Sequence, residues 1–194
     1  MKKITIFTLV IFVMLVLHNH LWVSAIVPSD ESITKGLNQV PKDADYICYV
    51  NFSQPSAEER FYIYDVKIHK FIYSGLTLHG SGKGNTARRA KFSNAVGSGC
   101  SSLGVYKVAS YGNMHKAPIK YFRLKGLSAT NSNAEKRGIL IHPSITASML
   151  PFEIKGVSLP LTVESKGCFA VDLHTMYAIK RCYDKGTVYV YAYY

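Results

Sequence analysis

Segments in which apolar and polar residues alternate recur along the chain from Tyr46 onward, and they constrain its fold more than any other feature. Residues 60–68, RFYIYDVKI, alternate aromatic or aliphatic side chains with more polar ones, as a half-buried strand requires. Five further segments rich in β-branched and aromatic residues have the same character: 70–78, 105–110, 119–127, 138–142 and 187–194. Glycine-rich or polar connectors separate them. We therefore expect a single mainly-β domain over residues 46–194.

Two short helices are expected among these strands. Residues 131–137 have the composition of one or two helical turns. The better-supported helix follows Asp172, a natural N-cap, and Gly186 lies just past its expected end. Its side chains recur at the i, i+3, i+4 and i+7 spacing of one helix face: Leu173, Met176, Tyr177 and Lys180. Residues 26–45 are polar and form either a flexible lead-in or a short N-terminal helix.

Residues 1–25 are expected to be a signal peptide rather than part of the fold. Two lysines precede an unbroken apolar run over residues 4–17, and Val23, Ser24 and Ala25 are small enough for a signal peptidase site. The run is short for crossing a hydrocarbon core of about 30 Å. An uncleaved N-terminal anchor is the alternative. We expect an exported protein, periplasmic or secreted, with no stable membrane span after signal cleavage.

The chain is basic, with 23 Lys and Arg against 12 Asp and Glu and a formal charge of +11. Exported basic proteins meet polyanions such as phospholipid head groups, teichoic acids and carboxylate-rich cell wall. The charge is equally compatible with a role in solubility alone. We expect no nucleic-acid partner, because the chain has no recognition module and carries an export signal. It has no P-loop, dinucleotide fingerprint or CxxC pair, which disfavours nucleotide-dependent enzymes and zinc ribbons.

The cysteines are the first candidates for chemistry. In an oxidising compartment the four of them would form two disulfides by default: Cys48, Cys100, Cys168 and Cys182. Cys168 departs from that default because it lies in a glycine-bearing turn directly before the helix at Asp172. A thiol there can be exposed and flanked by backbone N–H groups, which lowers its pKa and can bind an oxyanion. A disulfide half or a buried small hydrophobe is the alternative.

His142 is the candidate base. It ends the apolar run at residues 138–142, so its imidazole is expected at the tip of a core strand. A nucleophilic cysteine needs a base held by a rigid element, and His142 fits that role for Cys168. His79 ends another expected strand and is a candidate for the same cavity. A metal site built from these three residues is the weaker interpretation, since no close His-x-His or HExxH spacing supports it.

Three segments carry motifs in a fixed order: residues 91–106 (KFSNAVGSGCSSLGVY), 126–142 (GLSATNSNAEKRGILIH) and 165–171 (SKGCFAV). With the upstream segments VNFSQPSAEERFYIYDV and LHGSGKG, they resemble the catalytic domain of the murein L,D-transpeptidase family, in its shorter exported bacterial branch. The resemblance covers residues 50–194. It implies the family's fold, a mainly-β sandwich of mixed sheets with a few short helices.

The resemblance also implies a chemistry that needs no cofactor. Such enzymes cleave the L,D bond between the third residue of a peptidoglycan stem peptide and the terminal D-Ala. Cys168 would be the nucleophile that forms a thioester, and His142 the general base. Ser165 is the nearest match for the group that fixes the histidine tautomer, and the N–H groups of Gly167 and Cys168 are candidates for the oxyanion hole. The candidate substrate-binding residues are His79, Ser102, Arg137 and Lys166.

The acceptor stays open. The amine of a second stem would give a 3-3 crosslink, a lysine-bearing cell-envelope protein would become anchored to the wall, and water would give L,D-carboxypeptidase activity. Many family members have a glycine after the histidine and a second histidine before Gly-Cys, where this chain has Pro143 and Lys166. Pro143 lacks an N–H and is expected to reshape the pocket wall. Lys166 is a candidate for binding a stem carboxylate, although a solvated turn lysine is the simpler interpretation.

Two rival classes remain. One is a non-catalytic cell-wall-binding module or secreted effector that has kept the fold, which would have no reason to keep Cys168 reduced and reactive. The enzyme interpretation instead predicts a reduced Cys168, with any disulfide confined to the other three cysteines. A secreted peptidase acting on L,L bonds is the third class, and only the Cys–His pair supports it.

Overall fold

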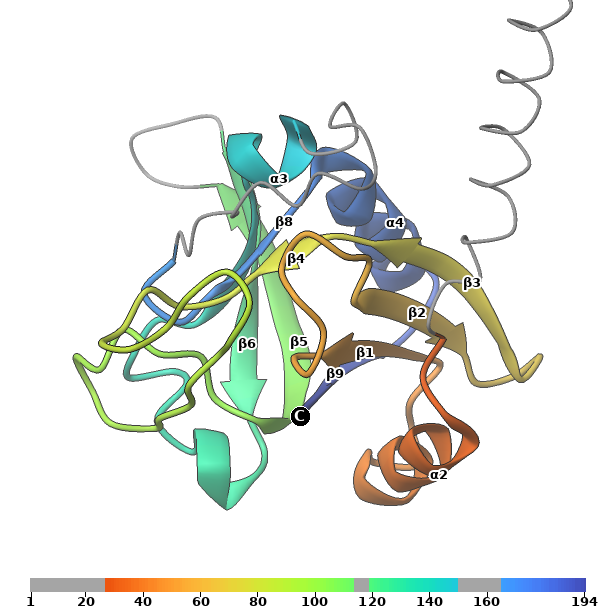
Figure 1. Ribbon diagram of the computed structural model, residues 1–194. Coiled ribbons are helices and arrows are strands. Elements are labelled where there is room, and N and C mark those ends of the chain that lie inside the picture. The colour runs from red at the N-terminus through yellow and green to blue at the C-terminus, as the bar shows by residue number, and fades with distance from the viewer. Residues whose placement is uncertain (1–26, 114–118, 150–164) are drawn as a thin grey trace, which may run out of the picture.

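The computed structural model describes residues 27–113, 119–149 and 165–194 (Figure 1). Its strands are β1 Tyr46–Asn51, β2 Phe61–Asp65, β3 Lys70–Gly75, β4 Thr77–Leu78, β5 Gly104–Asn113, β6 Lys120–Gly126, β7 Leu140–Pro143, β8 Phe169–Val171 and β9 Val188–Tyr193. Its helices are α2 Asp30–Gln39, α3 Ile145–Met149 and α4 Leu173–Tyr183, with a 3-10 turn, η1, at Ala129–Asn131. The expected signal peptide lies outside the described residues. Within them, no helix has the length and apolar character needed to cross a membrane.

The strands form one mixed sheet in the order β3-β2-β1-β9-β5-β6-β7-β8-β4. Neighbouring strands are antiparallel except for two parallel pairs, β1 with β9 and β7 with β8. The edge strands β3 and β4 are separated in the chain only by Leu76, so the sheet must curl until its two edges nearly meet. The predicted mainly-β fold, with mixed strand pairing and a few short helices, is confirmed.

The main hydrophobic core fills the space that this curled sheet and α4 enclose. Most strands of the sheet contribute to it, and its largest fully buried side chains include Phe61, Tyr106, Phe122 and Phe169. Burial of each such side chain contributes roughly 1.5–3 kcal/mol. The core therefore fixes β7 and β8, whose Ile141 and Phe169 both point into it.

Of the two alternatives for residues 26–45, a flexible lead-in or a short helix, the structure has the helix, α2. It covers the face of β1 that points away from the main core: the Tyr49 hydroxyl donates to the Ile33 carbonyl at 2.9 Å, and α2 lies below β1 in Figure 1. Gly36 permits this approach, because a Cβ at that position would lie 2.4 Å from the Tyr49 ring. Both faces of β1 are consequently buried, which removes the alternation that would have marked it as a strand.

The strand expected over residues 70–78 is broken at Leu76 into β3 and β4. The Leu76 N–H does not bond a neighbouring strand and instead donates to Asp172 Oδ2 at 3.0 Å. The same carboxylate accepts the Thr175 N–H at 2.9 Å and the Thr175 hydroxyl at 2.5 Å, so Asp172 is the N-cap of α4, as predicted. One buried side chain therefore joins the edge of the sheet to the helix that follows β8.

Replacing Asp172 by alanine is expected to lower the free energy of unfolding by about 2–4 kcal/mol, because a buried helix cap and two further hydrogen bonds to a carboxylate are lost. Urea denaturation followed by circular dichroism measures this. Asp184→Ala is the matched control, since Asp184 is exposed and pairs with Lys180 on the surface. Its loss should stay below about 1 kcal/mol. Equal losses for the two variants would contradict the role given to Asp172.

The prediction of a helix over residues 131–137 is wrong. That segment follows η1 as a series of turns. Asn131 is the cause, since its buried side chain donates to the Val105 carbonyl at 2.9 Å and accepts the Ser128 N–H at 2.9 Å. A side chain that bonds local backbone in this way competes with helix formation.

Candidate active site

Strands β7 and β8 place His142 and Cys168 in neighbouring segments of the sheet. The two strands run parallel, and His142 is the Cα partner of Ala170. Ile141 and Phe169 point into the main core, so His142, the next residue after Ile141, projects from the opposite face. Cys168 directly precedes β8, and its thiol contacts the N–H of Leu140, the first residue of β7, two residues before His142.

The thiol is held between two backbone groups of the neighbouring strand. The Leu140 N–H donates to Cys168 Sγ at 3.4 Å, and Sγ lies 3.7 Å from the Gly138 carbonyl, to which the thiol donates. Burial raises the pKa of Cys168, and the Leu140 N–H and the charge of Arg137 offset part of that rise. The predicted lowering of this pKa is wrong: Cys168 is partly buried, and the carboxylate of Asp172 caps α4.

The His142 ring has a defined tautomer. Its Nδ1 lies 3.0 Å from the Pro143 carbonyl oxygen. A carbonyl can only accept, so Nδ1 carries the proton and the neutral ring has its lone pair on Nε2. The resemblance gave this orienting role to Ser165, whereas in the structure Pro143 supplies the carbonyl. The backbone carbonyl of residue 143, which any residue there would supply, thus orients the candidate base.

Ser165 instead stabilises the turn that carries Cys168. Its hydroxyl donates to the Cys168 carbonyl at 2.7 Å and accepts the Gly167 N–H at 3.2 Å. Its carbonyl accepts the Ser81 N–H at 2.7 Å and the Ser81 hydroxyl at 3.0 Å, which ties the turn to the loop after β4. Because the Gly167 N–H is used inside the turn, the Cys168 N–H is the better candidate for an oxyanion donor.

Position 167 requires a glycine, because of its backbone conformation and because its neighbours leave no space for a side chain. Its φ is +114°, a region that L side chains rarely adopt. A Cβ there would lie 2.6 Å from Arg137 Nη2 and 2.6 Å from the Cys100 carbonyl. The backbone of the nucleophile turn therefore packs directly on the Arg137 guanidinium.

Arg137 links that turn to the segment 91–106. Its Nη1 donates to the Ser93 carbonyl at 2.8 Å and to Ser102 Oγ at 3.1 Å, and its Nη2 donates to the Cys100 carbonyl. Ser102 is buried and also bonds the Tyr106 hydroxyl at 2.9 Å. Ser102 thus positions Arg137 and has no surface of its own open to a ligand.

His79 lies on the other side of the sheet from the candidate pair. Leu78 is the Cα partner of Ala170 and shares its face, so the next residue, His79, points to the opposite face. The ring is fully buried. Nδ1 accepts from Arg60 Nη2 at 2.9 Å, and Nε2 donates to the Thr86 carbonyl at 3.0 Å. The structure therefore gives His79 a place in the core, and not the place beside Cys168 that the sequence suggested.

This buried histidine should make stability depend on pH. Burial, reinforced by the positive charge of Arg60, lowers the pKa of His79 to about 4. The unfolded chain then binds more protons between pH 4 and about 6.5, so stability is full above 6.5 and falls as the pH drops towards 4. We expect a loss of up to about 3 kcal/mol over this window, and a smaller loss in His79→Gln. Urea midpoints at several pH values measure this, and parallel curves for the two proteins would contradict it.

All four cysteines are free thiols, so the two disulfides expected by default are not formed. Cys48 and Cys182 are buried in the main core, Cys100 is buried and its carbonyl accepts from Arg137, and Cys168 is partly exposed. Across the described residues, no group of three His, Cys, Asp or Glu side chains gathers as a metal site would require, and His79, His142 and Cys168 form none.

Comparisons with known proteins agree with these motifs. A family model, the L,D-transpeptidase catalytic domain, matches residues 26–193. The search of curated proteins gives no match. An L,D-transpeptidase from Xylanimonas cellulosilytica is 14% identical over 80% of this chain and 63% of that one, with a TM-score of 0.40. The helical cell shape determining protein Pgp2 from Campylobacter jejuni is 15% identical over 78% and 48%, with a TM-score of 0.48.

This chain thus spans less than two thirds of each of these solved chains. The family model, in contrast, matches almost the whole of it, including every segment that builds the site. The chain belongs to the L,D-transpeptidase catalytic-domain family.

Proposed function

We propose that this chain is an exported cysteine acyltransferase that acts on peptidoglycan stem peptides. It cleaves the L,D bond before the terminal D-Ala through a thioester on Cys168 and passes the acyl group to an amine or to water. The observation that carries the proposal is the contact of the Cys168 thiol with the Leu140 N–H of β7, the strand on which His142 lies two residues later. Family membership supports the substrate class, and Lys2 and Lys3 followed by an apolar run support export.

The first half-reaction uses the hydrogen bond that orients His142. The thiol is neutral and His142 has its lone pair on Nε2, so Nε2 takes the Sγ proton as the sulfur attacks the carbonyl carbon of the third stem residue. The oxyanion that forms is stabilised by the Cys168 N–H. The intermediate collapses with cleavage of the C–N bond, and the imidazolium gives its proton to the departing D-Ala amine.

The second half-reaction reverses these roles. The acceptor, an amine of a second stem, a protein lysine or water, loses a proton to Nε2 of His142 as it attacks the thioester carbonyl. The C–S bond then breaks and Sγ recovers the proton. The raised pKa of Cys168 means that the thiol is ionised only as it attacks, so the base is needed in both half-reactions.

The proposal is tested by incubating the full chain with a purified disaccharide-tetrapeptide and identifying the products by mass spectrometry. Two stems joined with loss of one D-Ala would establish a transpeptidase, and a tripeptide would establish an L,D-carboxypeptidase. The same products with Cys168→Ala, or an unchanged tetrapeptide with the natural chain, would refute the proposal.

One observation favours the alternative, a wall-binding module without activity. A thiol whose pKa is raised by burial is a weaker nucleophile at neutral pH than an ordinary cysteine. Binding of the tetrapeptide to the natural chain without any turnover would support this second function.

A further inference from the structure

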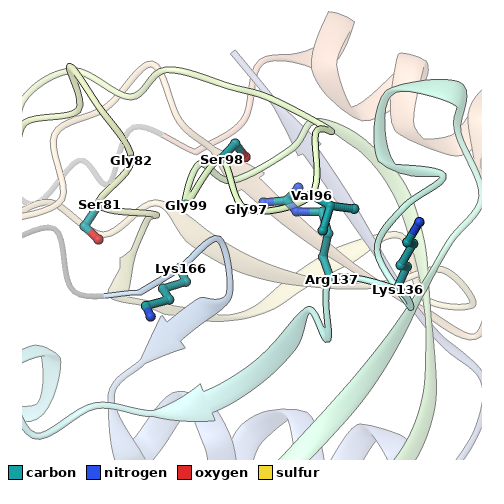
Figure 2. A pocket seen from close by; sticks show the side chains of 9 residues that line it. All are labelled: Ser81, Gly82, Val96, Gly97, Ser98, Gly99, Lys136, Arg137 and Lys166. Carbon is teal, nitrogen blue, oxygen red and sulfur yellow. The ribbon is translucent and has the colours of Figure 1, made fainter.

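A cationic pocket opens beside the nucleophile turn (Figure 2). Its volume is about 490 Å³, and it is lined by Ser81, Gly82, Val96, Gly97, Ser98, Gly99, Lys136, Arg137 and Lys166. Figure 2 shows Arg137 between Lys136 and Lys166, with the loop at residues 97–99 above it. Three of the lining side chains are cations and none is acidic.

The positive charge of this pocket is not neutralised within the described part of the chain. The ion pairs there involve other lysines and none of these three residues. Arg137 is immobilised by its hydrogen bonds to two backbone carbonyls and to Ser102 Oγ, which are neutral acceptors and leave its charge in place. Lys136 and Lys166 are exposed at the rim. A fixed cation flanked by two adaptable ones suits an anionic group.

The opposite wall is built from glycine backbone and two serines. Gly97 and Gly99 adopt φ values of +80° and +66°. A Cβ at Gly82 would lie 2.3 Å from the Ser98 carbonyl, so that close packing excludes any side chain. The Gly82 N–H donates to the Gly99 carbonyl at 2.9 Å and holds the two loops together. The wall therefore keeps its shape while leaving space for a ligand in front of Arg137.

The pocket, the thiol and the imidazole follow one another along the two parallel strands. Arg137 directly precedes Gly138, whose carbonyl accepts from the Cys168 thiol, and Lys166 precedes Cys168 by two residues. His142 lies beyond Cys168 in the strand direction, opposite Ala170. The base must reach both the departing amine and the acceptor, so these occupy the His142 side. The acyl part of the donor then extends from the thiol towards the cations.

We infer that this pocket binds a free carboxylate on the acyl side of the donor peptide and so selects acidic donors. The inference rests on the proposed function and names its substrate class more narrowly. Lys136 and Lys166 supply most of the selectivity, because they are exposed and can move onto a ligand, whereas Arg137 already donates three of its hydrogen bonds to the protein. Amidation of the carboxylates in the acyl part would remove the charge while leaving the scissile bond unchanged.

The test compares two disaccharide-tetrapeptides that differ only in whether the carboxylates of the acyl part are free or amidated. The full chain should have a kcat/KM about tenfold or more higher for the free form, since charge-assisted hydrogen bonds are about twice as strong as neutral ones. The double variant Lys136→Gln/Lys166→Gln should lose most of this preference, because its kcat/KM for the free form falls towards that for the amidated form. Lys70→Gln is the matched control, an exposed lysine on the edge strand β3, and should retain the preference.

Binding to the Cys168→Ala variant, measured by calorimetry, separates this inference from the proposed function. We expect tighter binding of the free form, and we expect Lys136→Gln/Lys166→Gln to abolish that difference. This result would support the inference even if the natural chain turned over neither donor. In that case only the proposed function would be refuted. Equal binding of the two donors, or turnover of both at the same kcat/KM, would overturn the inference.

Discussion

Cys168→Ala is expected to lower the rate of D-Ala release from a disaccharide-tetrapeptide by about 10³-fold or more, to the background. The thiol lies against β7, the strand that carries His142, through its contact with the Leu140 N–H. Alanine removes Sγ and its contacts with the Leu140 N–H and the Gly138 carbonyl. These contacts are weak, so the fold should be kept and the loss should be one of chemistry.

The matched control for that variant is Cys182→Ala. Cys182 is buried in the core on α4, away from the turn that carries Cys168. This variant should keep its activity while its thermal midpoint falls slightly, because a small cavity is left. D-Ala release is followed with a coupled assay, and circular dichroism reports the fold. Retention of more than a tenth of the activity by Cys168→Ala would remove it from the catalytic role.

His142→Gln is expected to reduce the same activity by about 10²–10⁴-fold, the range that a positioned general base contributes. Burial holds the Cys168 thiol protonated by raising its pKa, so attack without a base waits for the small thiolate fraction. That fraction grows with pH towards the raised pKa of the thiol. The residual activity of His142→Gln should therefore increase with pH more steeply than that of the natural chain.

The control for this variant is His174→Gln, because the His174 side chain is 90% exposed and lies outside the site. It should leave both the rate and the pH profile unchanged. A purely structural role for His142 would lower activity by the same factor at every pH. That parallel pH profile is the result that would contradict a role as base.

Much of the strand pattern could be predicted from the sequence, because the strands are short segments rich in aromatic and β-branched residues. Their burial could not be, since β1, β2 and β9 are buried on both faces, and α2 covers the second face of β1 through Tyr49. The cap at Asp172 was readable because capping is local. The bond that the same carboxylate accepts from the Leu76 N–H joins residues far apart in the chain, and so the break between β3 and β4 was not predicted.

The candidate site divides in a similar way. The motifs identified Cys168 and His142, but their relative placement depends on the register of β7 with β8. His79 was predicted to lie beside Cys168, but it points to the other face of the sheet. A strand with only two paired residues, such as β4, is too short for the sequence to show which face each residue occupies. The pKa of Cys168 was misjudged because burial depends on the packing around the turn. Lys136 was missed because a lysine in a polar turn carries no signal until the pocket forms around it.

The thioester on Cys168 is tested most directly by mixing the full chain with disaccharide-tetrapeptide, quenching in acid within seconds and measuring the mass of the intact protein. The expected result is an adduct equal to the donor without its terminal D-Ala, which maps after digestion to the peptide that contains Cys168 and disappears on addition of hydroxylamine. Release of D-Ala without any such adduct, or an adduct on Cys100 in its place, would contradict the proposed mechanism.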